Sequence, residues 1–313
     1  MKSVAITSRS FSKHPILRDE VLKRYPDAKF NDAGLSLNGN SLIDFLQGYE
    51  KAITALETID EKILSELPDL KVIGKYGVGL DMIDLDAMKK FGIKLGWTGG
   101  VNKRSVSELV VSFAIYLLHR VAFANTEVRN GEWYQVKSRQ LSDCTVGIIG
   151  CGHVGKDLIQ LLQPFNCNIL VHDTLDFKDF YQENNITPVR IEELIQKSDI
   201  VTLHLPLDSS TENIISRDRL QMLKKDAILI NLARGGLIDE DALKQILLEN
   251  KIAGAALDVF AIEPPVDTEF ALIDNVLITP HIGGSTEEAI LAMGMAAIDG
   301  LDNAKDSSNF LSK

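Results

Sequence analysis

The chain has 313 residues, of which 45% are hydrophobic and 25% charged, so it can bury a core in each of two domains. Its formal net charge of −11 at pH 7 would repel a polyphosphate backbone, and no dense run of lysine and arginine offsets it, which argues against nucleic acid as a partner. Three cysteines without C-x-x-C spacing predict neither a disulfide framework nor a metal site.

The first third of the chain alternates short β-branched runs with helix-length amphipathic segments, which is typical of βα units around a parallel sheet. We expect strands at residues 4–7, 28–30, 52–56, 71–73 and 94–96. We expect helices at residues 15–25, 41–47, 61–66 and 85–90. This order predicts a small doubly wound, flavodoxin-like domain.

Residues 103–122 are apolar on most faces and predict one long buried helix. A second βα series follows, with six strands expected at residues 145–149, 168–172, 200–204, 227–231, 253–258 and 276–279. A last helix is expected at residues 286–303. Glycine pairs at 99–100 and 283–284 suit changes of domain, because glycine tolerates the backbone angles of a hinge.

No segment predicts contact with a membrane. The first residues lack the apolar core of a signal peptide, and the longest apolar stretch, residues 109–118, is about half of a membrane span. Together with the cysteine pattern, this predicts a protein of the reducing cytoplasm.

The loop Gly150-Cys151-Gly152-His153-Val154-Gly155 is the clearest motif. A lone G-x-G-x-x-G is a weak signal, but this one follows an expected strand and begins an expected helix, residues 154–163, as in a dinucleotide site. Gly150 permits the tight turn, Gly152 lets backbone approach a pyrophosphate, and Gly155 lets the helix pack on the strand. Amides at the helix N-terminus would then face the pyrophosphate.

Asp173 ends the next strand, at the distance where a carboxylate accepts hydrogen bonds from the adenosine ribose. Residues 174–177 supply no lysine or arginine for a 2′-phosphate, which favours NAD over NADP. The alternative is that Asp173 caps the next helix. We therefore predict an α/β protein with two doubly wound domains. A Rossmann NAD-binding domain, residues 99–284, is inserted into a smaller flavodoxin-like substrate-binding (catalytic) domain, residues 1–98 plus 285–313.

Ligands of doubly wound sheets bind beyond the carboxyl ends of the strands, where three residues suit hydride transfer between a hydroxy acid and a 2-oxo acid. His281 is the best general acid/base of the six histidines. Arg234 could grip a carboxylate, or be an ordinary capping arginine. Glu263, in a turn that prolines fix, would favour the imidazolium if it lies beside His281.

These motifs resemble the D-isomer-specific 2-hydroxyacid dehydrogenases, a family that includes phosphoglycerate, glycerate and D-lactate dehydrogenases. The resemblance covers almost the whole chain. It is carried by residues 75–81 (KYGVGLD), 102–109 (NKRSVSEL), 150–155, 204–207 (HLPL), 231–239 (NLARGGLID), 256–260 (ALDVF), 263–264 (EP) and 279–284 (TPHIGG).

The resemblance implies that Arg234, Glu263 and His281 are the catalytic residues, with Glu263 orienting and tuning His281. The NAD contacts that it implies are Gly150, Gly152, His153, Val154, Gly155, Asp173, His204, Pro206, Leu232, Ala233, Arg234, Asp258, His281, Gly283 and Gly284. Substrate contacts would come from Val78 and Gly79 of the first domain, together with Arg234 and His281. It also implies a homodimer, formed through the region of the long helix.

The substrate is expected to be a 2-hydroxy acid with a small or uncharged tail. In phosphoglycerate dehydrogenases the turn after the third strand of the first domain carries Arg and Ser for the substrate phosphate. In this chain the same turn, residues 54–58 (TALET), supplies an acid and no base. Phosphoglycerate dehydrogenase activity is the alternative, with Lys103 or Arg104 serving the phosphate. Two further alternatives are an NAD(H)-sensing, non-catalytic interaction module and an enzyme that oxidises a small anion such as formate or phosphite.

Overall fold

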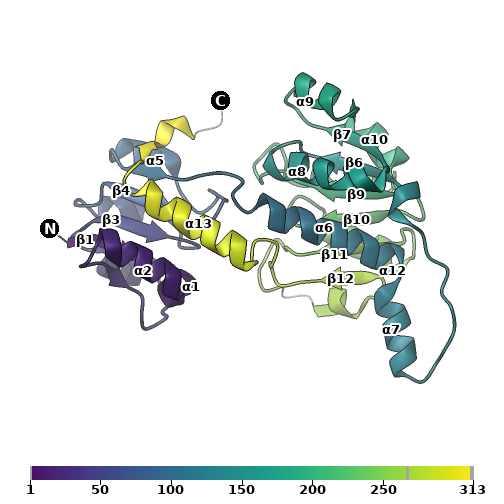
Figure 1. Cartoon of the computed structure of the whole chain (residues 1–313), viewed down its shortest axis with the longest axis horizontal. Coiled ribbons are helices and arrows are strands. Elements are labelled where there is room, and N and C mark those ends of the chain that lie inside the picture. Colours follow the sequence, from purple (N-terminus) through teal and green to yellow (C-terminus); the bar gives the residue numbers. More distant parts are fainter. Residues whose placement is uncertain (1, 266–267, 311–313) are drawn as a thin grey trace. The chain divides into compact units, whose positions relative to one another are not determined.

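The computed structural model describes residues 2–265 and 268–310. The chain divides into two compact units, shown in Figure 1. Unit 1 comprises Met1–Asn102 and Glu287–Lys313, and unit 2 comprises Lys103–Thr286. Both units contain a parallel sheet with helices on its two faces, as the sequence predicts.

Unit 1 has a six-stranded sheet in the order β13-β5-β4-β3-β1-β2. Its strands are β1 (Lys2–Ile6), β2 (Lys29–Phe30), β3 (Tyr49–Thr54), β4 (Val72–Lys75), β5 (Lys94–Gly96) and β13 (Lys305–Asp306). The first five are parallel in the flavodoxin-like order, and β13 adds an antiparallel edge that the sequence did not indicate.

The helices of unit 1 cover both faces of this sheet. They are α1 (Arg9–Lys13), α2 (Pro15–Arg24), α3 (Gly39–Leu46), α4 (Glu61–Ser65), α5 (Leu85–Lys90) and α13 (Glu287–Gly300), with the short η4 (Ser307–Asn309). Alternate strand residues face opposite cores: Val4 and Ile6 pack with α2 and α13, whereas Ala5 packs with α3, α4 and α5. Figure 1 shows α13 beside α2 on one face.

Unit 2 has a seven-stranded parallel sheet in the order β12-β11-β10-β9-β6-β7-β8. Its strands are β6 (Thr145–Ile149), β7 (Asn168–His172), β8 (Thr187–Pro188), β9 (Ile200–Leu203), β10 (Ile228–Asn231), β11 (Gly254–Leu257) and β12 (Val276–Ile278). The chain order reverses between β6 and β9, which is the topological switch point of a Rossmann fold. All six expected strands are present, and the extra strand, β8, is a two-residue edge.

The helices of unit 2 also lie on both faces of its sheet. They are α6 (Lys103–Leu118), α7 (Val121–Arg129), η1 (Leu141–Asp143), α8 (His153–Leu162), η2 (Gln163–Phe165), α9 (Lys178–Glu183), α10 (Ile191–Lys197), α11 (Arg217–Leu220), α12 (Glu240–Leu248) and η3 (Thr268–Leu272). One core contains α6 and α8, and the other contains α10, α11 and α12. Strand β10 serves both, since Ile228 and Ile230 enter the first core and Leu229 the second. Burial on both faces explains its unbroken apolar run.

The single long helix expected at residues 103–122 is wrong. The structure has two helices, α6 and α7, bent by 58° at residues 119–120, where Arg120 adopts a left-handed conformation with φ of 52°. The apolar pattern continues through the break, so periodicity did not reveal it. Within the described residues no single helix is long and apolar enough to span a membrane, although α6 and α7 together pass that test by length and composition.

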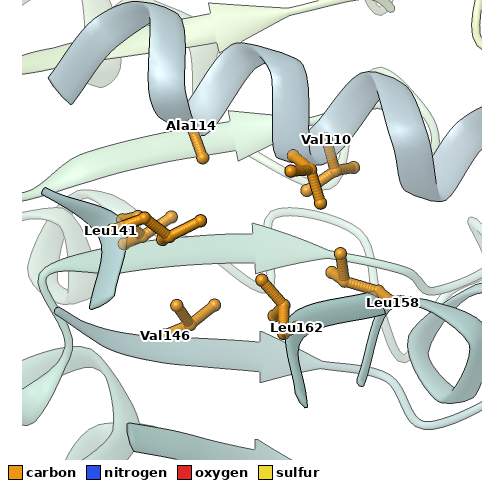
Figure 2. Close-up of a pocket in the computed structure, with 8 residues that line it drawn as sticks. Val110, Ala114, Leu141, Val146, Leu158 and Leu162 are labelled. Atoms are coloured by element: carbon orange, nitrogen blue, oxygen red, sulfur yellow. The ribbon is translucent and has the colours of Figure 1, made fainter. Parts of the chain in front are cut away.

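A small cavity of about 10 Å³ lies beneath α6 (Figure 2). Its walls are apolar side chains: Val110, Val111, Ala114, Leu141, Val146, Leu158, Leu162 and Ile200. A cavity of this size holds at most about one water molecule, and an apolar lining offers that water no hydrogen bonds. The cavity is therefore a packing gap in the core and not a ligand site.

Candidate dinucleotide and catalytic site

The glycine loop connects β6 to α8 at the switch point. Gly150 has φ of +100°, and a Cβ built there would lie 2.4 Å from the carbonyl oxygen of His204. A Cβ on Gly155 would lie 2.1 Å from the carbonyl oxygen of Gly150. Both positions exclude a side chain because backbone occupies the space, as the sequence analysis inferred for the turn and for the helix packing.

Gly152 differs from these two glycines. It is the N-cap residue of α8, it has no side chain to cap the helix, and a Cβ built on it would meet no heavy atom of the described chain within 4 Å. The next residue, His153, is exposed. The N-terminal amides of α8 therefore face an open cradle, and such amides together with the helix dipole favour an anion such as a pyrophosphate.

Asp173 follows β7 and is hydrogen-bonded to the glycine loop. Its Oδ2 accepts from the backbone N–H of Cys151 at 2.6 Å, and its Oδ1 accepts from the N–H of Leu175 at 2.8 Å. The alternative that Asp173 caps the next helix is wrong, because the N-cap residue of α9 is Phe177. The partly exposed carboxylate is thus fixed beside the loop, where it retains lone pairs for another donor.

His204 follows β9, on the other side of the switch point. Its Nε2 lies 3.1 Å from the Thr202 hydroxyl, and burial lowers the pKa of its imidazole to about 3. The ring is therefore neutral at pH 7. His172, at the end of β7, has its Nδ1 3.0 Å from the carbonyl oxygen of Val189 in the neighbouring segment.

The loop that follows β10 carries Arg234, and Asn231 organises it. The Asn231 side-chain amide donates to the Arg234 carbonyl at 2.8 Å, and its oxygen accepts from the Ala233 N–H at 3.0 Å. The guanidinium Nη1 of Arg234 donates to the Ala233 carbonyl at 2.6 Å. Leu232 is buried beneath the loop. A tight, internally bonded turn therefore holds the guanidinium at the carboxyl edge of the sheet.

Glu263 and His281 are in direct contact. Glu263 Oε2 lies 2.8 Å from His281 Nδ1, and Glu263 Oε1 accepts from the Phe260 N–H at 3.1 Å. The two side chains are 38% and 47% exposed, so the pair is accessible to a ligand. Because Nδ1 faces the carboxylate, Nε2 is the ring nitrogen left for a substrate.

Asp258 shapes the loop that presents His281. Its buried carboxylate accepts from the Thr279 hydroxyl at 2.5 Å, the Ile282 N–H at 2.8 Å and the Gly283 N–H at 2.7 Å. Its carbonyl accepts from the His281 N–H at 2.9 Å, which helps to hold His281 in a left-handed conformation with φ of 54°. The sequence predicts only a cofactor contact for Asp258 and does not reveal this role.

Several expected cofactor contacts already have partners inside unit 2. The carbonyl of Gly283 accepts from the Ser105 hydroxyl at 2.6 Å, and the carbonyl of Val154 accepts from Ser107 at 3.3 Å. The Pro206 carbonyl accepts from the Thr211 hydroxyl at 2.8 Å. Gly284 is partly buried. Their contacts with NAD, and that of Asp258, stay predictions.

In unit 1, Val78 and Gly79 lie in the loop after β4, where the Val78 carbonyl accepts from Trp97 Nε1 at 3.1 Å. A cation that the sequence pattern does not indicate lies beside the turn at residues 54–58. Lys75 ends β4, is buried, and donates to the carbonyl of Ala55 in the turn described above as lacking a base. Glu57 of the same turn accepts from the Ala55 N–H at 2.6 Å.

Arg104, one of the two alternatives for a phosphate contact, pairs with the buried carboxylate of Asp157 at 3.1 Å. No cluster of His, Cys, Asp and Glu in the described part of the chain could hold a metal ion.

The chain is similar to proteins of a known family. Residues 111–283 match the model of the "D-isomer specific 2-hydroxyacid dehydrogenase, NAD binding domain" family. The chain belongs to this family. The matched segment contains the glycine loop, Asp173, Arg234, Glu263 and His281.

Among the similar proteins is D-3-phosphoglycerate dehydrogenase of Methanocaldococcus jannaschii, 34% identical over 282 residues, which are 89% of this chain and 54% of that protein. Hydroxypyruvate reductase of Thermotoga maritima is 35% identical over 236 residues, 74% of this chain and 76% of that protein. The chain thus spans about half the length of the archaeal phosphoglycerate dehydrogenase.

Solved structures of family members have the same fold. A putative D-isomer specific 2-hydroxyacid dehydrogenase from Polaromonas superposes with a TM-score of 0.87 at 28% identity, covering 96% of both chains. D-lactate dehydrogenase from Aquifex aeolicus, in complex with NAD and lactic acid, has a TM-score of 0.83 at 26% identity, covering 95% of this chain and 93% of that chain.

Proposed function

We propose that the chain is an NAD-dependent D-2-hydroxyacid dehydrogenase that interconverts a 2-oxo acid and the D-2-hydroxy acid. The observation that carries this proposal is the contact between Glu263 and His281 at 2.8 Å. It joins an acid/base pair at the same edge of the sheet from which the Arg234 loop emerges, since β10, β11 and β12 are parallel neighbours.

The residues of unit 2 fit NAD. The open cradle at Gly152 and the N-terminal amides of α8 would hold the pyrophosphate, and Asp173 would accept hydrogen bonds from the adenosine ribose. Neutral His204 adds no charge at the switch point. When bound, NADH supplies the hydride of the reduction.

Each residue of the catalytic trio has a defined task. Arg234 binds the carboxylate of the 2-oxo acid through two parallel N–H donors. His281 donates the proton on Nε2 to the carbonyl oxygen as that oxygen gains negative charge, and it takes the proton back in the reverse direction. Glu263 holds the ring through Nδ1 and stabilises the imidazolium. Val78 and Gly79 would contribute backbone contacts to the substrate.

The substrate class that we propose is a 2-oxo acid with a small or uncharged tail. Glu57 places a carboxylate in the turn where a phosphate would otherwise bind, and Lys75 is buried beneath that turn with its ammonium on the Ala55 carbonyl. Arg104 is paired with Asp157. These contacts favour an uncharged tail over 3-phosphoglycerate, which stays the second candidate because a phosphoglycerate dehydrogenase is among the relatives.

A substrate panel tests the proposal. Loss of NADH absorbance is measured with glyoxylate, pyruvate, hydroxypyruvate, longer oxo acids and phosphohydroxypyruvate. Turnover of an uncharged-tail oxo acid supports the proposal, and turnover of phosphohydroxypyruvate alone supports the second candidate. Reduction of NAD with formate or phosphite alone would indicate a different dehydrogenase. Binding of NADH without turnover of any substrate would indicate an NAD(H)-sensing interaction module.

We further propose a homodimer in the cytoplasm, formed through α7 and the segment after it. None of the nine residues of α7 is buried, Val121 and Val128 are exposed, and Trp133 is 86% exposed. Several large apolar side chains exposed along one segment favour a subunit interface there. The three cysteines, all in the described part of the chain, are free, which fits a reducing compartment. Light scattering after size exclusion should give twice the 34.6 kDa chain mass, and Trp133→Ser should shift the measured mass toward that of a single chain.

A further inference from the structure

Glu240 is the first residue of α12, but it does not cap that helix. The cap is Asp239, whose side chain accepts from the Ala242 N–H at 2.9 Å. The partly buried carboxylate of Glu240 instead accepts from the Ala261 N–H at 2.8 Å, and the backbone N–H of Gly236 lies close enough to lower its pKa. The side chain therefore reaches from the segment that follows β10 and bonds to the loop that follows β11.

These two loops touch through their backbones. A Cβ built on Gly235 would lie 1.9 Å from the carbonyl carbon of Phe260 and 2.2 Å from the nitrogen of Ala261. With no side chain at Gly235, the two backbones approach directly, and the Glu240 carboxylate bonds across this contact. Arg234 lies directly before this contact, and Glu263 lies shortly after it.

Retaining a carboxylate at this position is costly. Burial and the nearby charges of Asp241 and Glu263 raise the pKa of Glu240, whereas the backbone N–H groups of Ala261 and Gly236 act in the opposite direction. Helix capping does not account for the position, since Asp239 performs it. The bond to the loop that follows β11 does.

We propose that Glu240 is a positioning residue that locks the Arg234 loop and the Glu263 loop in one register. The Arg234 guanidinium and the Glu263–His281 pair can then contact the same 2-oxo acid. This inference rests on the proposed function, which supplies the shared substrate. Glu240 itself touches no reacting atom.

The test is Glu240→Gln. Glutamine keeps the length of the side chain but replaces a charged acceptor by a weaker neutral one, and its NH₂ group would face the N–H of Ala261 or of Gly236. Misplacement of catalytic groups by about 1 Å costs up to about 10²-fold in rate. We therefore expect kcat per NADH-binding site to fall by about 10- to 100-fold, with the Kd for NADH unchanged and faster amide hydrogen exchange at Ala261.

The matched control is Asp241→Asn. Asp241 is exposed in the same turn of α12, so this variant removes the same charge near the helix N-terminus without touching either loop. It should match the wild type in all three measurements. A merely structural role of Glu240 would lower turnover and the number of NADH-binding sites in proportion, and kcat per site would not change.

The proposal is overturned if folded Glu240→Gln keeps both the wild-type kcat per site and the wild-type exchange rate at the Ala261 amide. If Glu240→Gln yields no folded protein, Glu240→Asp, which keeps the charge but is too short to reach the Ala261 N–H, is judged by the same criteria. If the wild type reduces no 2-oxo acid, the proposed function fails separately. The amide exchange then decides alone whether Glu240 holds the two loops.

Discussion

The two halves of the sheet in unit 2 differ at their carboxyl edges. Around β6 and β7, Asp173 accepts from the Cys151 N–H, but the N-terminal amides of α8 stay open, with a glycine at the N-cap and no heavy atom of the described chain within 4 Å of a Cβ built on it. Around β10, β11 and β12 the loop N–H groups are bonded within the unit, since Asp258, Glu263 and Glu240 accept from them. Binding an anion requires unsatisfied donors, whereas orienting a proton donor requires loops whose donors are already satisfied.

This difference predicts that changes in one half alter chemistry and changes in the other alter cofactor affinity. The largest effect should come from His281→Ala, which removes the proton donor. Turnover should fall by about 10²–10⁴-fold, measured at saturating NADH. The Kd for NADH should change little. The control His119→Ala removes an exposed histidine of unit 2 and should leave turnover and the Kd for NADH unchanged. Full turnover in His281→Ala would contradict the assignment of proton transfer to the half of the sheet around β10, β11 and β12.

The reciprocal change is Gly152→Val in the open half. A branched side chain would fill the cradle beside the α8 amides, so the Kd for NADH should rise by about 10-fold or more, equivalent to about 1.4 kcal/mol. Fluorescence titration of NADH measures it. Gly152→Ala should have a smaller effect in the same direction, and kcat at saturating NADH should be retained in both. An unchanged Kd in the valine variant would show that the pyrophosphate does not lie there.

Asp173→Asn tests which cofactor the half around β6 and β7 prefers. The carboxylate would repel a 2′-phosphate and bind the ribose hydroxyls, so its neutralisation should narrow the preference for NADH over NADPH by about 10-fold. The ratio of kcat/KM for the two cofactors measures this preference. Asp176→Asn, an exposed acid three residues on, should leave the ratio unchanged. A wild type that already uses NADPH as well as NADH would contradict the role given to Asp173.

The smallest effect concerns His204, which lies where the two halves meet. Its pKa is about 3 in the folded protein against an ordinary 6.5, so between these values the unfolded chain binds a proton that the folded chain does not. The free energy of unfolding should therefore fall as the pH drops below 6.5, by at most about 1.4 kcal/mol per pH unit. Urea unfolding from pH 7 to 5 measures this slope.

His204→Gln should flatten that slope, because it removes the group that takes up the proton. His119→Gln, at an exposed position, should keep the slope of the wild type. Equal slopes in the wild type and in His204→Gln would show that His204 is not held neutral by its surroundings.

The strands and both sheets could be predicted from sequence because residues buried on both faces form unbroken apolar runs between turn signals. The break between α6 and α7 could not, since it depends on one left-handed residue, Arg120, inside a continuing apolar pattern. Strand β13 has two residues and no periodicity. Its pairing with β5 is a long-range event that local sequence does not encode.

The candidate site shows the same limit. The glycine loop and Asp173 were found because their spacing is local and has a known physical reason. The contact between Glu263 and His281 joins residues 18 apart through loop geometry, and residue positions alone left it a guess. Glu240 was missed because an acid in the first turn of a helix already has an ordinary explanation in the helix dipole.

The central claim is that the edge carrying Arg234, Glu263 and His281 reduces a 2-oxo acid with NADH. The most direct measurement is chiral chromatography of the product formed from the best oxo acid of the panel other than glyoxylate, whose product is achiral, quantified against the NADH consumed. The account predicts one D-2-hydroxy acid for each NADH. Formation of the L-isomer, of a racemate, or of no hydroxy acid while NADH is consumed would contradict it.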